Sequence, residues 1–128
     1  MILVTAAIIF NEGRILIARR SSDNKLPLVW EFPGGKVEEG ETPQECLQRE
    51  LLEELGIKVT VGDFLGKSNY SYPHGQIELL AYYVTWEEGN IKLTSHDYVA
   101  WVSLDEIKEY DMAPADMPIV NILLANAK

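Results

Sequence analysis

One helix is specified more completely than any other element of this 128-residue chain. It begins at Thr42-Pro43-Gln44-Glu45, where a threonine at the N-cap and a glutamate three positions later form a capping box, and proline takes the favoured first position. Gly56 supplies a stop, because glycine readily adopts the left-handed conformation that closes a helix. The sequence therefore predicts a helix over residues 43–55, and the rest of the fold must pack around it.

Runs that favour β-strands lie on both sides of this helix. The runs rich in β-branched and aromatic residues are 2–10, 14–19, 29–32, 59–72, 76–86 and 98–102, with a hairpin turn at 11–13. In 76–86 both alternating faces are largely apolar, which is typical of a central strand covered on two sides. Residues 103–106 form a second capping box, and a last helix is expected to start near Asp116. These elements predict one α/β domain over residues 1–128, with a mixed sheet and helices on both faces.

The chain is acidic, with a formal net charge of −9. Such a surface repels phosphate backbones, so nucleic acid is not expected as a partner, and an anionic substrate needs local positive charge or a bound cation. No apolar run approaches the roughly 20 residues of a membrane span, and residues 1–5 lack the features of a signal peptide. Cys46 is the single cysteine, so a cytoplasmic location is expected. The oligomeric state is left open.

Three glutamates fall on one face of the predicted helix. Glu50, Glu53 and Glu54 lie within about 100° of arc, at roughly 100° per residue. Like charges this close repel one another, and a solvated glutamate-rich face is the common explanation for such a cluster. A hard divalent cation is the alternative, because Mg²⁺ binds carboxylate oxygens and water. The preceding Gly34-Gly35 gives a backbone that can turn sharply and offer main-chain groups to a metal or a phosphate.

The spacing of the whole block favours the metal site. From Gly35 the chain continues with five residues, Glu41, seven residues, Arg49-Glu50, an aliphatic residue, one more residue, Glu53-Glu54, one residue, Gly56 and an aliphatic residue. This is the pattern of the Nudix box, here residues 35–57, so the chain resembles the Nudix hydrolases and, within them, the short MutT-like proteins. The resemblance covers essentially the whole chain, including 31–36 and 111–118. It implies an α/β/α sandwich in which the box forms a loop–helix–loop.

The resemblance also implies a catalytic divalent cation, Mg²⁺, which Mn²⁺ can replace. Matched by motif position, Glu53 and Glu54 are the main metal ligands, and the Gly34 carbonyl is a further ligand. Glu50 is expected both to bind metal and to act as general base on the attacking water. The catalytic set is then Glu50, Arg49 and Glu53.

Two positively charged residues have roles in the same resemblance. Arg49 braces the glutamates through ion pairs, with Glu41 as its expected partner, and Lys36 faces the phosphates. The implied reaction is substitution at phosphorus by water, in which bound cations neutralise the developing charge. In the MutT branch, attack at the β-phosphorus gives a nucleoside monophosphate and pyrophosphate, a reaction that cleanses the nucleotide pool.

One position departs from the MutT-like pattern. Those proteins commonly carry a glutamate about six residues before the tryptophan that matches Trp101, where it assists metal binding or acts as a base. Here the position is Ser95, followed by His96 and Asp97. Either Asp97 substitutes as an accessory acid or base, or Glu50 acts alone and the segment is simply a loop.

The MutT-like resemblance favours a nucleoside triphosphate as substrate. Asp116 matches the position at which MutT-like proteins place a base-reading side chain, although aspartate before Met117-Pro118 is also a natural N-cap. An ionised carboxylate only accepts hydrogen bonds, so it suits cytosine N4 or the N1/N2 edge of guanine, including 8-oxoguanine. Residues 113–116, Ala-Pro-Ala-Asp, look most like the relatives of MutT that act on CTP and 5-methyl-dCTP and also accept oxidised purines. This resemblance implies CTP, 5-methyl-dCTP and 8-oxo-dGTP as candidate substrates.

Two residues join Asp116 as candidates for substrate binding. Phe32 either stacks on the base or packs in the core, and Arg20 either reaches the phosphate or base or is a solvated surface arginine. ADP-ribose, a dinucleoside polyphosphate and a capped RNA end are alternative substrates. A nucleotide-sensing module without turnover is the alternative outside enzymes, but such a module is expected to have lost metal ligands, and all three glutamates are present.

Overall fold

The computed structural model describes residues 1–20, 29–73, 75–93 and 96–127. Its elements, in chain order, are β1 (Ile2–Asn11), β2 (Arg14–Arg20), β3 (Trp30–Glu31), α1 (Pro43–Leu55), β4 (Lys58–Tyr72), β5 (Gly75–Glu88), β6 (His96–Val102), η1 (Glu106–Glu109), η2 (Pro114–Asp116) and α2 (Met117–Asn126). The strands lie where the sequence predicts them. Neither α1 nor α2 is both long and apolar enough to cross a membrane, within the residues that the structure describes.

The strands form one mixed sheet. Its order is β3-β2-β1-β5-β4, and β6 also pairs with β2. β1 and β5 are parallel over eight residue pairs, from Ile2 opposite Ile77 to Ile9 opposite Val84. The other pairs, β1 with β2, β2 with β3, β2 with β6 and β4 with β5, are antiparallel.

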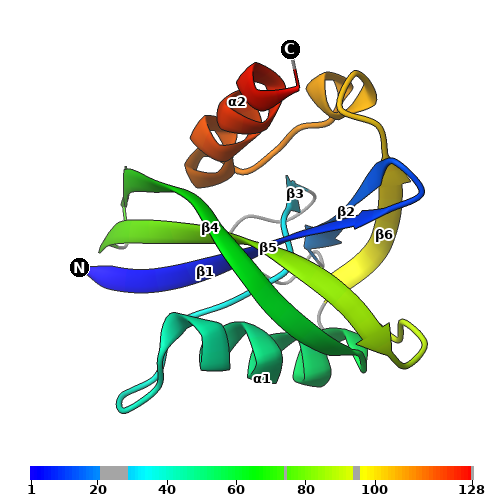
Figure 1. Cartoon of the computed structure of the whole chain (residues 1–128). Helices are drawn as coiled ribbons and strands as arrows, with labels where there is room; N and C mark the ends of the chain where they lie inside the picture. Colours follow the sequence, from blue (N-terminus) through cyan, green and yellow to red (C-terminus); the bar gives the residue numbers. More distant parts are fainter. Residues whose placement is uncertain (21–28, 74, 94–95, 128) are drawn as a thin grey trace.

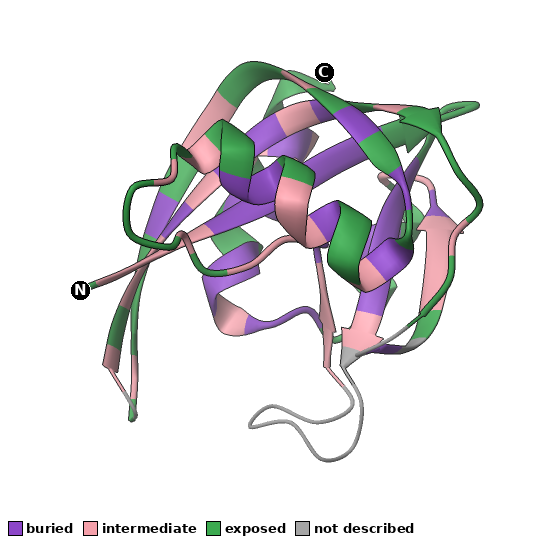
Figure 2. Cartoon of the chain, turned by 90° about the horizontal axis from the view of Figure 1, so that it is seen from below, coloured by how far each residue is buried: buried purple, intermediate pink, exposed green. Residues whose placement is uncertain are grey.

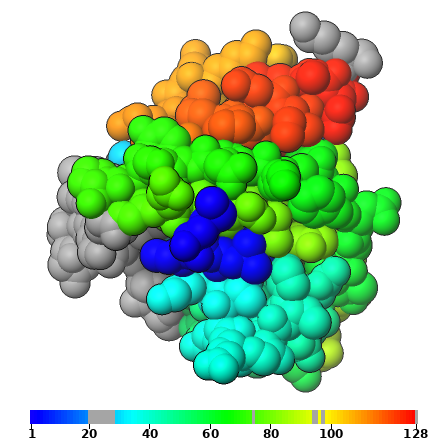
Figure 3. Space-filling model, turned by 90° about the vertical axis from the view of Figure 1, so that its left-hand side faces the viewer, coloured from blue at the N-terminus to red at the C-terminus, as the bar shows by residue number. Residues whose placement is uncertain are grey.

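Helices cover the two faces of the sheet, as the sequence predicts. α1 lies below the sheet and α2 above it in Figure 1, and the space-filling view shows the strands between the two helical layers (Figure 3). Leu79 and Ala81 of β5 pack in the cluster that includes α2, while Tyr82 and Val84 pack in the cluster that includes α1. The prediction that residues 76–86 form a central strand covered on two sides is therefore confirmed.

The bounds and caps of α1 are those expected from the sequence. The Thr42 hydroxyl accepts from the Glu45 amide at 3.1 Å, and the Glu45 carboxylate accepts from the Thr42 amide at 2.9 Å. Gly56 closes the helix in the left-handed conformation, with φ of 71°. The apolar side of α1 is buried against the sheet (Figure 2). Of the three glutamates, Glu53 is exposed, whereas Glu50 and Glu54 are half-buried.

The second capping box forms, but a short 3₁₀ helix follows it. The Ser103 amide donates to the Glu106 carboxylate at 2.8 Å, and the Glu106 amide donates to the Ser103 hydroxyl at 3.2 Å. The helical turn η1 ends after four residues, at Glu109. Reciprocal caps satisfy the first amides of a helix, but they do not set its length.

Candidate active site

The glycine loop that precedes α1 is hydrogen-bonded along the edge of β1. The Ala7 amide donates to the Pro33 carbonyl at 2.7 Å, and the Thr5 amide donates to the Gly35 carbonyl at 2.8 Å. Gly34 lies between these bonds with φ of 152°, and a β-carbon on it would overlap the Thr5 carbonyl. Only glycine fits this close approach of two backbones. The loop is thus held rigidly next to the helix that carries the glutamates.

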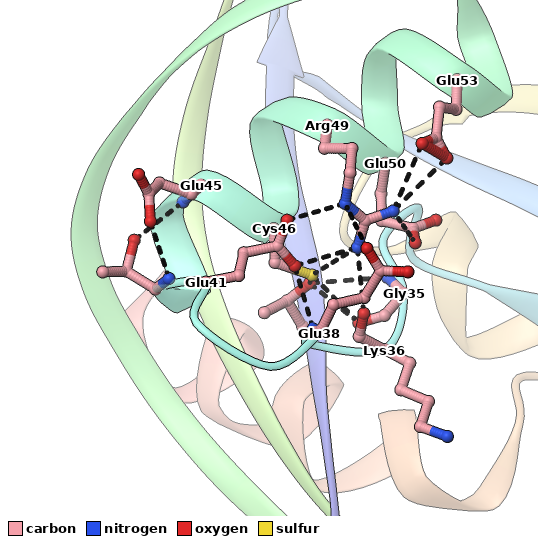
Figure 4. Close-up of polar contacts among 11 residues, drawn as sticks. Gly35, Lys36, Glu38, Glu41, Glu45, Cys46, Arg49, Glu50 and Glu53 are labelled. Atoms are coloured by element: carbon pink, nitrogen blue, oxygen red, sulfur yellow. Dashed lines mark hydrogen bonds and ion pairs between the residues drawn. The ribbon is translucent and has the colours of Figure 1, made fainter.

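Arg49 is the centre of the polar network on this face of α1 (Figure 4). Its guanidinium donates twice to Glu41, from Nε at 2.7 Å and from Nη2 at 2.9 Å. Nη1 donates to Glu50 at 2.8 Å and lies 3.3 Å from the Glu53 carboxylate. Nη2 also donates to the Lys36 carbonyl at 3.1 Å. The ion pair expected between Arg49 and Glu41 is present, and the same guanidinium holds two of the candidate metal ligands.

The network perturbs the titration of both its principal members. The Arg49 guanidinium, together with the Glu38 main-chain amide, lowers the pKa of Glu41 from its ordinary 4.5 to about 2. In return, the hydrogen bonds to Glu41 and Glu50 raise the pKa of Arg49 further above its already high value. Both charges are therefore maintained at every pH at which the protein is expected to work.

The three candidate metal-binding carboxylates have different surroundings. The Glu53 side chain is 59% exposed, whereas those of Glu50 and Glu54 are only 17% and 15% exposed. Glu50 lies against Gly35, so closely that a β-carbon there would overlap its carboxylate. Among the residues that the structure describes, no three acidic, histidine or cysteine side chains converge as a ready-made metal cluster.

The donor set nevertheless fits a hard divalent cation. Carboxylate oxygens from successive turns of one helix are ligands of the kind that Mg²⁺ prefers, and Mg²⁺ usually keeps several waters instead of requiring a complete protein cage. The missing side chain at Gly35 is what admits the Glu50 carboxylate beside the loop. Glu50, Glu53 and Glu54 are therefore the residues that could hold such an ion.

Sequence reasoning missed two residues next to this face. The His96 ring lies between carboxylates of two other elements: its Nε2 is 2.7 Å from Oε2 of Glu31, and its Nδ1 is 3.5 Å from Oε2 of Glu54. Glu31 immediately precedes the loop sequence Phe32-Pro33-Gly34-Gly35, and His96 adjoins the position where MutT-like proteins have a glutamate. Those two adjacencies were the available signals.

Asp116 connects the start of α2 to the beginning of the glycine loop. It occupies the predicted N-cap position, but it does not cap the helix with its side chain. Its Oδ2 accepts from the Phe32 amide at 2.8 Å instead, and the residue is only 6% exposed. The neighbouring Ala115 amide donates to the Tyr72 hydroxyl at 3.1 Å. The expectation that Asp116 caps α2 is wrong at the level of the side chain, because the Phe32 amide binds the carboxylate.

The other residues predicted to bind substrate differ in their burial. Phe32 is buried in the cluster beneath α2, which favours packing over stacking on a base. The Lys36 side chain is exposed and extends away from the Arg49 network (Figure 4). Arg20 ends β2 and Asp97 lies in β6, but their side chains fall outside the described residues, as does Ser95.

Known proteins share both the sequence and the fold of this chain. The model of the NUDIX domain family matches residues 2–121. The CTP pyrophosphohydrolase of Escherichia coli (strain K12) is 39% identical over 125 residues, which are 98% of this chain and 93% of that protein. The 8-oxo-dGTP diphosphatase of the same strain is 36% identical over 118 residues, covering 91% of this chain and 92% of that protein.

Solved structures of similar proteins have the same fold as this chain. The solution structure of the E. coli ORF135 protein superposes with a TM-score of 0.88 at 39% identity, covering 98% of this chain and 89% of that one. The crystal structure of the MutT protein from Methanosarcina mazei Go1 has a TM-score of 0.89 at 29% identity, covering 99% of this chain and 96% of that one.

Proposed function

Because the chain belongs to the NUDIX domain family, we propose that this hydrolase is a Mg²⁺-dependent nucleoside triphosphate pyrophosphohydrolase that releases a nucleoside monophosphate and pyrophosphate. The observation that carries the proposal is the acidic face of α1, where Arg49 binds both Glu50 and Glu53 and the Glu50 carboxylate lies against Gly35. Proteins of the family use a divalent metal ion, and these carboxylates provide hard oxygen ligands for one.

Each residue then has a role set by its position. Glu53 and Glu54, with Glu50 and the Gly34 carbonyl, would hold the cation, which neutralises phosphate charge and lowers the pKa of a bound water. Glu50, shielded but accessible, takes the proton of the attacking water. Arg49 donates hydrogen bonds to the carboxylates of Glu50 and Glu53 and so fixes their positions.

Positive charge must also meet the phosphates, since the chain carries a net charge of −9. The exposed ammonium of Lys36 is on the loop that leads into α1, and we assign it to the phosphates. Arg20, at the end of β2, is the second candidate. The cytoplasmic location expected from the single cysteine remains a prediction.

For the base, the proposal is a cytosine or an oxidised purine. The relatives named above act on CTP and 8-oxo-dGTP according to their names, and Asp116 is the base-reading candidate. The bond from the Phe32 amide orients its carboxylate, and a carboxylate can accept more than one hydrogen bond. It would accept from cytosine N4 or from the N1/N2 edge of guanine.

The test is chromatographic separation of the products formed with Mg²⁺ over a panel of CTP, dCTP, 5-methyl-dCTP, dGTP, 8-oxo-dGTP, ADP-ribose and diadenosine polyphosphates, with pyrophosphate release measured for the triphosphates. We expect turnover of a triphosphate that is lost on chelation and in Glu53→Gln, and retained in Glu109→Gln, an exposed glutamate of η1. Cleavage of ADP-ribose or dinucleoside polyphosphates alone would overturn the proposal that the substrate is a nucleoside triphosphate. Metal-dependent binding of a nucleotide without product would favour a sensing module.

Two measurements sharpen this test. In ¹⁸O-labelled water, attack at the β-phosphorus puts the label into pyrophosphate, whereas attack at the α-phosphorus puts it into the monophosphate. Asp116→Ala should raise KM and flatten base preference, while Asp116→Asn keeps an oxygen for the Phe32 amide and separates base reading from folding. Unchanged discrimination between dCTP, dGTP and 8-oxo-dGTP in both variants would exclude Asp116 as the reader.

A further inference from the structure

His96 forms a bridge between two acidic residues that lie far apart in the sequence. Its Nε2 is 2.7 Å from the Glu31 carboxylate, and its Nδ1 faces the Glu54 carboxylate at 3.5 Å. The His96 side chain is 3% exposed. β3, which carries Glu31, and β6, which carries His96, both pair with β2. The sheet therefore sets the ring beside Glu54 of α1.

The contact between His96 and Glu31 is a short hydrogen bond that anchors the ring. An ionised carboxylate only accepts hydrogen bonds, so the ring binds its two carboxylates through N–H groups: the N–H at Nε2 donates to Glu31, and the N–H at Nδ1 faces Glu54. The short distance and the burial of the ring define the direction in which the opposite nitrogen points. That nitrogen, Nδ1, points at Glu54.

The contact between His96 and Glu54 is unusual because the ring nitrogen is buried and makes no hydrogen bond among the described residues. In the described part of the chain, Nδ1 of His96 is one of three buried side-chain nitrogen or oxygen atoms that make no hydrogen bond. Its distance of 3.5 Å from Glu54 is within ion-pair range but long for a hydrogen bond. Burying a polar atom without a hydrogen-bond partner is costly. The Glu54 carboxylate, at 3.5 Å, is the acidic group within reach of this nitrogen, and a closer approach would satisfy it.

We propose that His96, anchored by Glu31, is a positioning residue that orients the Glu54 carboxylate toward a divalent cation. The inference rests on the proposed function in assigning Glu54 as a metal ligand. A carboxylate that binds metal through one oxygen is commonly held by a neighbour through the other, and loss of such a neighbour weakens metal affinity by about 10–100-fold. His96 supplies that neighbour from β6, whereas Glu54 lies in α1.

The test is a titration of each variant with Mn²⁺ alone, followed by the electron paramagnetic resonance of free Mn²⁺, alongside nucleotide hydrolysis. We expect His96→Ala to weaken Mn²⁺ binding about tenfold and to lower kcat with KM changed less than about twofold. His96→Gln keeps a donor and should recover part of the loss. Glu31→Ala, which removes the anchor, should weaken binding in the same direction. Ile107→Val, a mild change in the core, should lower Tm without changing Mn²⁺ affinity.

A double-mutant cycle distinguishes positioning from a general loss of structure. In a Glu54→Gln background, His96→Ala should cause little further loss of Mn²⁺ affinity, because the effect acts through Glu54. An additive loss, or Mn²⁺ binding by folded His96→Ala within about twofold of the wild type, would overturn the proposal. If His96→Ala does not fold, the comparison of His96→Gln and Glu31→Ala with Ile107→Val decides by the same criterion.

The outcomes also separate this inference from the proposed function. Weaker Mn²⁺ binding by His96→Ala in a protein that hydrolyses none of the nucleotides would support the positioning role and reject the activity. Full hydrolysis by the wild type, with unchanged Mn²⁺ binding in His96→Ala, would reject the positioning role alone.

Discussion

The carboxylate of Glu50 fills the space into which a side chain on Gly35 would project. The obstacle to a larger residue at Gly35 is thus a movable side chain with an assigned role in catalysis. We expect Gly35→Ala to displace Glu50 and to lower kcat by about 100-fold, as misplacements of about 1 Å do, with Tm nearly unchanged. Steady-state kinetics and thermal denaturation measure the two effects, and a fully active Gly35→Ala would contradict the assignment of Glu50.

Gly34 is the matched control for this variant, because a side chain at Gly34 would collide with main-chain atoms, which cannot move aside as the Glu50 side chain can. A β-carbon there meets the Thr5 carbonyl, and φ is 152°. Gly34→Ala should cost about 2 kcal/mol of stability, or roughly 8 °C in Tm for a domain of this size. Thermal denaturation without nucleotide checks this prediction, and equal Tm values for the two alanine variants would show that the loop is not held as described.

The Glu41–Arg49 pair should give the protein a specific acid limit. The pKa of Glu41 is lowered from 4.5 to about 2, so the pair stabilises the fold above pH 4.5, and this contribution is lost as the pH falls to about 2. Glu41→Gln should therefore have a lower Tm than the wild type at pH 7, and the difference should shrink across that window. A difference that is constant with pH would mean that the charge of Glu41 is not the cause; Glu109→Gln is the control.

The Tyr72 hydroxyl should stabilise the segment that carries Asp116. It accepts from the Ala115 amide at 3.1 Å, so Tyr72→Phe leaves that amide without this bond. The expected cost is about 1 kcal/mol, or roughly 4 °C in Tm, with a higher KM for nucleotide. The neighbouring Tyr70, whose ring centroid is 4.6 Å from that of Tyr72, is the matched control, and equal effects of Tyr70→Phe and Tyr72→Phe would argue against the hydrogen bond.

Asp97 remains the candidate to replace the glutamate that MutT-like proteins have at the position of Ser95. If it acts as an accessory acid or base, Asp97→Asn should lower kcat at unchanged Tm. A loss of less than about threefold would remove it from the mechanism. Combining this variant with His96→Gln would show whether the two neighbours act on the same step.

Local signals in the sequence were sufficient for the bounds of α1, and the resemblance to the Nudix box was sufficient for the pair of Arg49 with Glu41. The helix bounds follow from Thr42 and Gly56, whose capping hydrogen bonds are to residues three to five positions away in the sequence, and Glu41 lies eight positions before its partner Arg49. These features depend on short stretches of chain, so the pattern of residues determines them directly.

The bridge through His96 could not be predicted in this way. Glu31 and His96 are 65 positions apart, and they meet only because β3 and β6 pair with the same strand. The helix-capping role expected of the Asp116 side chain is wrong for the same reason. Its neighbours in sequence predict a cap, but the Phe32 amide, 84 positions earlier, binds the carboxylate instead. Tertiary contacts override a local preference wherever they offer a better partner.

The parallel pairing of β1 with β5 also bears on how the chain is made. Ile9 pairs with Val84, 75 positions later, an interval that a ribosome takes roughly 4 to 15 seconds to translate. Throughout that time one edge of an apolar strand has no partner, and open edges of this kind recruit other chains. A nascent chain that pauses before residue 84 is therefore the form of this protein most in need of a chaperone.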